Sequence, residues 1–405
     1  MLFQTLDDKR QCVGIYFDSE LYFDIQDFPQ ELTRSWKYTP FMQGYRGVEY
    51  AELYALGKTI DECCPEHLRD DWDQAKNRIK AFIKANRTAG LSSSAYCMFD
   101  MIPPSFLKQF CHAKNLISDW VISNYKKPVN YKHLLATTEM LRDIEHYDIR
   151  IDTEALEAKE GDPSARQLID RVKSYKTKVK YDLFATRTGR LATTKRSFPL
   201  FTLKKGHRNV VLPKNDFFVE LDFNGAELRT LLALSDKEQP SGDVHDWNVR
   251  NVFDDKVSRD EAKVLFFSWL YGSRSEDLKD WVRPLGLAYD TRQLKRKHFD
   301  NGLVLTPYSR QLECSDRLFV NYLIQSTTAD ICYEQFVKVW TALRSKASEV
   351  AFVLHDAIVI DLKLEDKDLI EDLAKVMSQT RFGKYSVNVS IGKNFRDMRK
   401  TKISV

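Results

Sequence analysis

Two aspartates stand at the ends of apolar runs that are typical of buried strands. Asp222 lies near the end of FFVELDF, just before a helix expected to begin near Gly225, and Asp356 follows His355 in AFVLHDAIVIDL. The second run predicts a hairpin with this polar pair at its tip. If the strands are neighbours, the two carboxylates meet at one edge of a sheet and can hold hard cations. Taken singly, either acid could instead serve a turn.

A second pattern lies on a predicted helix that begins at Arg259 and ends near Gly272. Ser258 and Glu261 form a capping box at its start. Residues spaced by four share one face of a helix, and here that face carries two cations followed by two rings: Arg259, Lys263, Phe267 and Tyr271. Cations are unfavourable in the first turn, so an anionic ligand such as a triphosphate is one explanation. A solvated surface helix is the other.

The surrounding sequence predicts mixed helices and strands. Near the start, aromatic runs on either side of Ser19 and Glu20 predict a hairpin. Apolar residues at helical spacing then predict a helix that stops at Gly90; they are Trp72, Ala75, Ile79, Phe82 and Ile83. Residues 131–180 have a helical pattern, and residues 181–405 alternate strand-like runs with helices.

Composition excludes some classes of protein. The formal charge of the 405 residues is only +4, so binding to nucleic acid must depend on where the basic residues lie. Seven cysteines without a CxxC pair argue against a disulfide framework and a structural zinc site, and favour a reducing compartment. The start, MLFQTLDDKRQ, and the absence of a long apolar run lead us to expect a soluble, untargeted protein without a membrane partner.

Basic residues are concentrated between Arg166 and Arg208. This segment has thirteen Lys or Arg residues but only two acids, Asp170 and Asp182. Such a run can be a solvated face, but it also suits a phosphate backbone, with affinity that depends on salt. Because the run leads into TGRL and the strand with Asp222, we favour duplex binding.

Three motifs in order resemble the family A (bacterial polymerase I-like) DNA polymerases. LDFNGAELRTLLALS resembles the first polymerase motif, RDEAKVLFFSWLYG the second and VLHDAIVID the third. DVHDWNVRNVF resembles the segment with a phosphate-contacting histidine, TGRL a primer-contacting turn, and NYLIQSTTADI the template-side helix. The resemblance covers about residues 130 to 390.

The resemblance implies a role for each matching residue. Asp222 and Asp356, with the Phe223 carbonyl, would hold two Mg²⁺ ions, for which Mn²⁺ would substitute. Lys263 would join the two aspartates in catalysis and could donate a proton to pyrophosphate. The incoming dNTP would be bound by a further set: His245, Arg259, Lys263, Phe267, Tyr271 and Glu227. Of these, Glu227 matches the steric gate against a 2′-hydroxyl, which favours DNA over RNA synthesis. Primer-template DNA would be contacted by Arg190, Arg317, Asn321, Gln325 and His355.

The implied fold is α+β, a right-hand polymerase with an antiparallel palm sheet. We expect a small N-terminal domain at 1–130, a reduced thumb with the basic segment at 131–187, palm at 188–235 and 313–405, and fingers at 236–312. The reaction would be attack of the primer 3′-hydroxyl on the α-phosphate with release of pyrophosphate.

The sequence departs from the family in three places. Only 33 positions separate Leu156 from Gly189, so the thumb is short and we expect distributive synthesis. Ala357 stands where an acid usually follows Asp356, and we expect activity to survive this change. The triplet from Asp18 to Glu20 has the DxE form of an exonuclease motif, but without companion motifs a hairpin turn explains it better.

Several alternatives stay open. Replication of a phage or plasmid is the leading process, with location in the host cytoplasm if phage-encoded; gap-filling or translesion synthesis is the second. Editing or processivity could reside on a separate exonuclease or processivity subunit. A non-catalytic, polymerase-derived DNA-binding subunit is a different class, but it would be expected to lose Asp222, Asp356 or Lys263, and all three are present.

Overall fold

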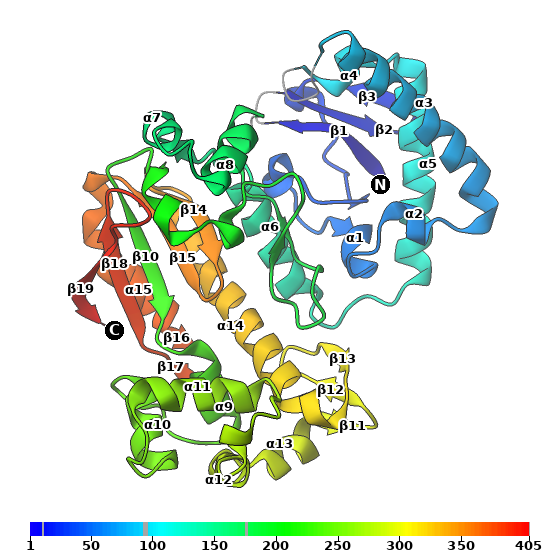
Figure 1. The fold of residues 1–405 in the computed structure, drawn as a ribbon. Coiled ribbons are helices and arrows are strands. Elements are labelled where there is room, and N and C mark those ends of the chain that lie inside the picture. Colours follow the sequence, from blue (N-terminus) through cyan, green and yellow to red (C-terminus); the bar gives the residue numbers. More distant parts are fainter. Residues whose placement is uncertain (10–11, 92–95, 175–176, 405) are drawn as a thin grey trace. The chain divides into compact units, whose positions relative to one another are not determined.

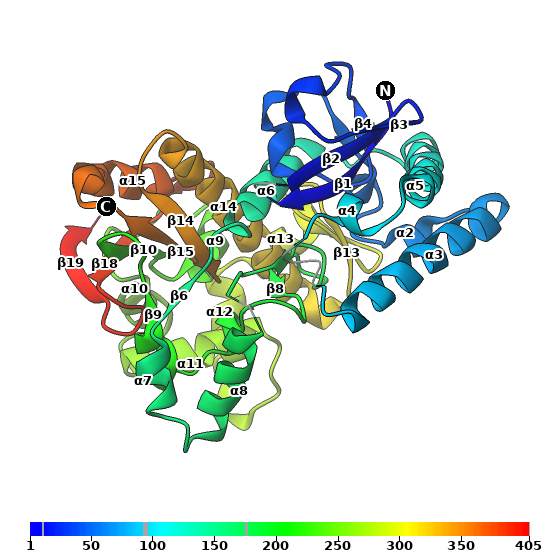
Figure 2. The ribbon, with the colours of Figure 1, turned by 90° about the horizontal axis from the view of Figure 1, so that it is seen from above.

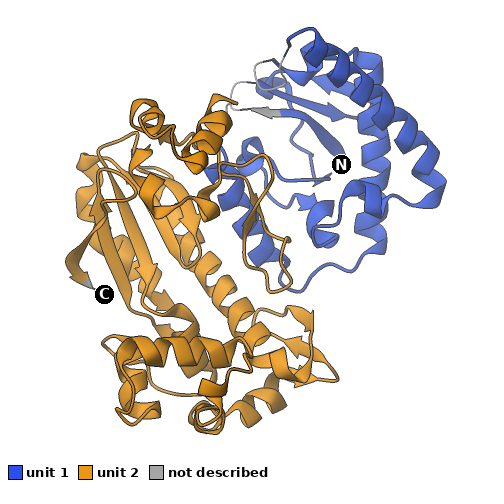
Figure 3. Cartoon of the chain, in the orientation of Figure 1, with its two compact units in different colours: residues 1–146 blue, residues 147–405 orange. Residues whose placement is uncertain are grey.

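A computed structural model describes residues 1–9, 12–91, 96–174 and 177–404 of the chain. It divides into two compact units, Met1–His146 and Tyr147–Val405 (Figure 3). The division falls between residues 146 and 147, which is later than residue 130, where the sequence suggested that the first domain ends. Among the described residues, none of the helices combines the length and apolar character needed to cross a bilayer.

The first unit contains a small antiparallel sheet and several helices. The sheet has the order β1-β2-β3, with strands Phe3–Lys9, Cys12–Phe17 and Glu20–Tyr22. Its helices of more than five residues are α3 (Arg69–Thr88), α5 (Pro104–Asn124) and α6 (Tyr131–Ile144). Shorter elements complete it: α1 (Ala51–Tyr54), α2 (Ile60–Cys63), α4 (Met98–Met101), β4 (Arg34–Ser35) and β5 (Glu49–Tyr50).

Two predictions for the first unit are confirmed. α3 buries Trp72, Ala75 and Ile79, and the chain turns after it at Gly90, where φ is 81°. The predicted hairpin is formed by β2 and β3. Asp18 and Ser19 make its turn with φ of 46° and 65°, and Glu20 pairs with Lys108.

The cysteines differ in part from the expectation. Cys12 and Cys97 form a disulfide that joins β2 to the residue before α4, so the argument against disulfides was wrong for this pair. Cysteine spacing alone could not reveal it, because 85 residues separate the two positions. The other five cysteines are free thiols.

The second unit is built on a five-stranded antiparallel sheet of order β14-β15-β10-β18-β19 (Figures 1 and 2). Its strands, in chain order, are β10 (Phe217–Phe223), β14 (Glu349–Leu354), β15 (Ala357–Leu362), β18 (Val387–Gly392) and β19 (Arg399–Ser404). The predicted α+β class with an antiparallel sheet is therefore confirmed.

The faces of this sheet differ because side chains alternate along each strand. One face of β10 carries Val219, Leu221 and Phe223, all buried, and α15 (Ile370–Ser378) packs against β10 and β18. On the other face, Phe218 joins a core with residues of α7 (Thr153–Glu157) and α8 (Pro163–Lys173). Beyond Phe218 that face becomes polar, with Glu220 and Asp222.

Helices between β10 and β14 form the rest of the unit. The longest, α14 (Phe319–Leu343), packs against β14, α15 and α9 (Ala226–Leu234). The other helices are α10 (Val244–Val252), α11 (Arg259–Leu270), α12 (Val282–Ala288) and α13 (Thr291–His298). They share a second core with α14, centred on Phe253, Phe266 and Tyr289.

Short strand pairs complete the second unit. Residues 299–313 form a three-stranded sheet of β11 (Phe299–Asp300), β12 (Leu303–Leu305) and β13 (Gln311–Glu313). The remaining strands pair in twos: β6 (Arg150–Ile151) with β9 (Val211–Leu212), β7 (Tyr181–Asp182) with β8 (Ala192–Thr193), and β16 (Gln379–Thr380) with β17 (Gly383–Lys384). Of these, β7 and β8 flank the TGRL turn.

Candidate active site

The two predicted carboxylates are neighbours at one end of the large sheet. Asp222 on β10 lies opposite Ala357 on β15, and Asp356 directly precedes Ala357 in the turn between β14 and β15. The Phe223 amide donates to the Asp356 carbonyl at 3.4 Å, which ties the two chain segments together. His355 makes the tight turn with a φ of 56°. The predicted hairpin with its polar tip is thus confirmed.

The electrostatics of this pair favour a cation. Burial, and then the neighbouring carboxylates of Asp356 and Glu220, raise the pKa of Asp222 to about 7. Burial is also the main cause that raises the pKa of Asp356. Two half-buried carboxylates at one place disfavour each other's ionised form, and a divalent cation would offset both the desolvation and the repulsion. The donors are oxygens, which Mg²⁺ and Mn²⁺ prefer.

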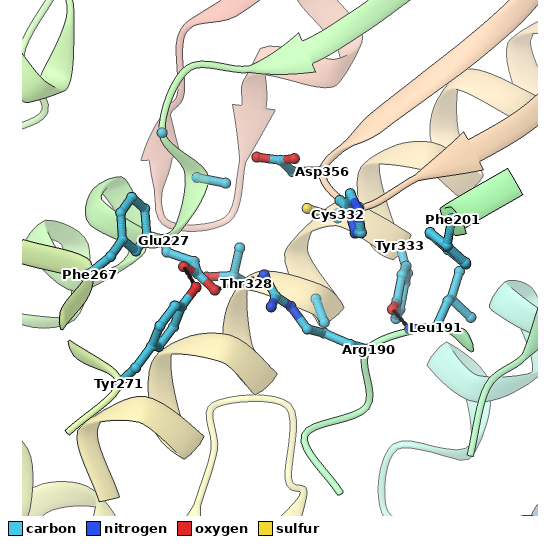
Figure 4. A pocket seen from close by; sticks show the side chains of 14 residues that line it. Arg190, Leu191, Phe201, Glu227, Phe267, Tyr271, Thr328, Cys332, Tyr333 and Asp356 are labelled. Carbon is cyan, nitrogen blue, oxygen red and sulfur yellow. Dashed lines mark hydrogen bonds and ion pairs between the residues drawn. The ribbon is translucent and has the colours of Figure 1, made fainter. Parts of the chain in front are cut away.

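Asp356 opens onto a cavity of about 370 Å³ (Figure 4). Five of the predicted site residues line it with Asp356: Arg190, Glu227, Phe267, Tyr271 and His355. The remaining walls come from the TGRL turn, a short 3-10 helix at Leu200–Thr202, the start of α9, and α14: Leu191, Phe201, Gly225, Ala226, Thr328, Ala329, Cys332 and Tyr333. The cavity therefore brings the metal-site candidate, the predicted steric gate and the predicted primer contact to one space.

Glu227 is at the centre of a hydrogen-bonded group in this cavity. Its side chain is only 7% exposed. One carboxylate oxygen accepts from Arg190 Nη2 and the other from the Tyr271 hydroxyl, both at 2.9 Å. Burial raises the pKa of Glu227, while Arg190 and Tyr271 oppose this effect. Burial and Glu227 raise the pKa of Tyr271 to about 12, so its hydroxyl keeps its proton and donates.

The turn that carries Arg190 is fastened to α14. The Tyr333 hydroxyl donates to the Gly189 carbonyl and accepts from the Leu191 amide, each at 2.9 Å. Thr188 donates to the side-chain oxygen of Gln325 at 3.3 Å. The predicted primer-contacting turn and the predicted template-side helix are therefore in direct contact.

The second motif forms α11 with the predicted capping box at Ser258. Phe267 lies between two rings, with its centroid 6.0 Å from His245 and 5.7 Å from Tyr271. Tyr271 directly follows the last residue of α11, yet its ring still lies beside that of Phe267, as the spacing predicted. Lys263 is exposed. The predicted cationic and aromatic face is present.

Arg259 corrects one step of the sequence argument. An anionic ligand was expected to balance this cation at the helix start, but acidic side chains already do so. Arg259 Nη2 lies 2.7 Å from an Asp243 oxygen, and Asp246 and Asp260 are both at 3.5 Å. Asp243 comes from the start of α10, 16 residues earlier, so helical periodicity could not reveal it.

His245 is uncharged at neutral pH. Its side chain is 5% exposed, and burial lowers its pKa to about 4 against the opposing effect of Asp243. Its Nδ1 atom is buried without a hydrogen-bond partner. A neutral imidazole can donate a hydrogen bond to a phosphate oxygen but adds no positive charge.

Other predicted residues lie outside the described lining of the cavity. They are Asp222, Phe223, His245, Arg259, Lys263, Arg317, Asn321 and Gln325. Lys263 still acts on the cavity electrostatically, because it lowers the pKa of Asp356. Arg317 is exposed before α14, and Asn321 is buried within that helix.

The part of the cavity formed by α14 was not predicted from the sequence. Thr328 and Cys332 continue the stripe of Arg317, Asn321 and Gln325 at helical spacing, which was the available signal. Thr328 is 5% exposed and its hydroxyl has no hydrogen-bond partner. Cys332 is buried beside the acids, and burial raises its pKa well above the usual value.

Comparisons with known proteins point to a single family. No family model matches the chain. The chain is 25% identical over 241 residues to DNA polymerase I of Caldicellulosiruptor bescii, which covers 47% of this chain and 28% of that protein. The chain is similar to the family A DNA polymerases of bacteria. Thermostable DNA polymerase I of Thermus aquaticus is 23% identical over 245 residues, covering 48% of this chain and 29% of that protein.

The fold agrees with this similarity. A solved structure, the POL domain of Pol1 from M. smegmatis in complex with DNA primer-template and dNTP, superposes with a TM-score of 0.66 at 14% identity. The match covers 97% of this chain and 95% of that one. The chain nevertheless spans less than a third of the length of the family A polymerases it matches in sequence.

Proposed function

We propose that the chain is a template-directed DNA polymerase that adds dNMP units to a primer 3′-hydroxyl and releases pyrophosphate. The observation that supports this most directly is the pairing of Asp222 with Asp356 beside a cavity that also holds Glu227 and Tyr271. These residues belong to three segments far apart in sequence. Their resemblance to the family A motifs agrees with the sequence and fold similarities.

The two aspartates are the proposed ligands of two Mg²⁺ ions, with the Phe223 carbonyl as a further ligand and Mn²⁺ as the proposed substitute. Bound metal would supply Lewis-acid activation of the attacking hydroxyl and charge neutralisation on the leaving group. The protein side chains position the reactants. Phe267 packs on the incoming sugar, Glu227 and Tyr271 restrict its 2′ position, and the exposed Lys263 and Arg259 receive the triphosphate.

Arg259 must exchange partners to do this. In the structure its guanidinium is held by Asp243, which is partly exposed, so an arriving triphosphate competes with a carboxylate for the same donors. His245 contributes a neutral hydrogen bond close by. Lys263 is the proposed proton donor to pyrophosphate.

Primer-template DNA is the proposed macromolecular partner. Arg190, His355 and the α14 residues Arg317, Asn321 and Gln325 would follow the primer terminus and the template without reading sequence. The basic residues between 166 and 208 would contact phosphates. We propose palm for 188–235 and 313–405, fingers for 236–312, and a reduced thumb for 131–187. Residues 1–130 are an accessory domain without an assigned role.

Primer extension tests this function. The purified chain is incubated with a primed template, Mg²⁺ or Mn²⁺, and either dNTPs or rNTPs. We expect template-dependent extension with dNTPs that is lost in Asp356→Asn, because one metal ligand is removed. Asp368→Asn serves as the matched control and keeps activity, because it changes an exposed acid that lies beyond the other end of β15. Wild-type extension by Asp356→Asn would refute the assigned site.

A further inference from the structure

Arg190 and Glu227 are joined in a way that the proposed roles do not explain. Arg190 is the proposed primer contact and Glu227 the proposed sugar gate, yet the two share a 2.9 Å ion pair inside the same cavity (Figure 4). The Tyr271 hydroxyl occupies the other oxygen of the Glu227 carboxylate. Both oxygens of the gate are therefore engaged, one of them by the residue that would contact the primer.

The two partners are unequal in their access to solvent. The Glu227 side chain is 7% exposed, whereas that of Arg190 is 45% exposed. Arg190 can therefore reach an additional ligand with its remaining N–H groups, since a guanidinium offers five donors. Glu227 has no comparable freedom. A buried carboxylate that loses its charged partner is destabilised, because water cannot reach it to replace that partner.

The backbone around Arg190 is held in place, so any adjustment must occur in its side chain. Tyr333 hydrogen-bonds on both sides of the residue. Gly189 has a φ of 78°, and a Cβ atom there would lie 2.7 Å from the Arg310 guanidinium. Arg310 is itself fixed by two hydrogen bonds to the fully buried Asp330, at 2.7 and 2.8 Å.

We infer that Arg190 couples the primer terminus to sugar selection: it holds Glu227 in place as in this structure, and a correctly paired 3′-terminal nucleotide lets it keep this contact while its other donors bind the primer. This inference rests on the proposed polymerase function and adds a specificity-determining role for the ion pair. A correct pair presents acceptors where Arg190 can bind them without leaving Glu227. A mispaired terminus shifts those acceptors, draws the guanidinium away and releases the gate.

Sugar discrimination should therefore depend on the primer terminus, which would not be so for two independent sites. Discrimination between dNTP and rNTP should be high on a matched primer and lower on a primer with a mismatched 3′ end. Coupling between sites is commonly worth about 5-fold to 150-fold. Because the pair is half-exposed on the Arg190 side, we expect a value near the lower end, about fivefold.

The test compares kcat/KM for dNTP and rNTP on matched and mismatched primers. In the wild type, the dNTP/rNTP ratio is expected to fall about fivefold on the mismatched primer. In Arg190→Ala the ratio should be low and equal on both primers. Arg292→Ala, which removes an exposed arginine on α13, is the matched control and should keep the wild-type dependence.

The outcomes separate the inference from the function. The coupling would be overturned if the wild type extends primers but shows the same dNTP/rNTP ratio on matched and mismatched termini. The polymerase assignment would then stay intact. Retention of the fivefold effect in Arg190→Ala would also overturn it. Absence of any extension by the wild type would overturn the proposed function. If Arg190→Ala does not fold, Arg190→Lys is read in the same way, because lysine lacks the planar fork that can hold two partners at once.

Discussion

Asp222 lies directly opposite Ala357 across the β10–β15 ladder, one position from the second carboxylate on Asp356. The two acids thus enter the site from β10 and from the turn before the adjacent strand β15, and they share one anionic, half-buried volume. Ala357 is small and 5% exposed, so it adds no charge to that volume. The next carboxylate along β10 is Glu220, on the same face of the sheet.

Metal affinity should depend on pH because of this pair. Asp222, with its pKa raised to about 7, must lose its proton to bind a cation, so affinity for Mn²⁺ should fall about tenfold per pH unit below pH 7. In the apoprotein Asp222 keeps a proton between about pH 4 and 7 that it loses in the unfolded chain, so its own contribution to the free energy of unfolding should decrease as pH rises through this window. Calorimetric Mn²⁺ titrations and urea denaturation at pH 5 to 8 measure both. A pH-independent affinity between pH 5 and 7 would contradict the assignment.

Replacement of Lys263 should lower the catalytic rate. A positioned general acid contributes about 10²- to 10⁴-fold, so Lys263→Ala should reduce kcat by at least about a hundredfold. Lys263→Arg should recover nucleotide binding but not the rate, since arginine keeps its proton. Single-turnover dNTP incorporation gives the measurement. Lys256→Ala, which removes an exposed lysine shortly before α11, should leave the rate unchanged. Wild-type turnover by Lys263→Ala would remove this residue from the mechanism.

Gly225 is required where β10 passes into α9. Its φ is 65°, and an added Cβ would lie 2.5 Å from Val244 Cγ1. Gly302 has a similar φ of 81°, but the nearest atom to an added Cβ is 3.7 Å away. Gly302→Ala should therefore cost only the backbone strain of about 1–2 kcal/mol. Gly225→Ala should cost more and also weaken sugar discrimination, because Glu227 follows two residues later. Urea denaturation and dNTP/rNTP kinetics distinguish the two variants; equal effects would refute the steric argument.

Asp361 supports the sheet that carries the site. It is fully buried and accepts hydrogen bonds from the Tyr147 hydroxyl at 2.8 Å and from the amides of Lys214 and Asn215 at 2.8 and 3.1 Å. Tyr147→Phe should lower the free energy of unfolding by about 1.5–3 kcal/mol, as for a hydrogen bond to a charged group. Asp361→Ala strands several donors and should cost more. The exposed Asp368→Ala should change stability by less than about 0.5 kcal/mol.

Synthesis should be distributive, because the segment between Leu156 and Gly189 is short and offers little to enclose a duplex. A primed long template with excess unlabelled DNA as a trap should give products of only a few added nucleotides per binding event. Affinity should also fall steeply with salt, since the described part of the basic segment holds mostly exposed or half-exposed lysines and arginines. Kilobase products in the presence of the trap would refute this prediction.

Local signals in the sequence predicted most of the elements that carry the site. The capping box at Ser258, the strand before Asp222 and the hairpin around Asp356 all depend on neighbouring residues, and all are confirmed. What could not be predicted depends on residues distant in sequence. The pairing of Arg259 with Asp243, the clamp of Tyr333 on the Arg190 turn and the Cys12–Cys97 disulfide each join separate segments.

The alternation along β10 also determines where this chain can tolerate changes in length. A single residue inserted between Phe218 and Asp222 would turn the acid towards the hydrophobic side beneath α15 and expose Leu221 in its place. Two inserted residues would restore the side but move the acid by about 7 Å along the strand, out of reach of Asp356. Natural or engineered insertions should therefore be excluded from this strand.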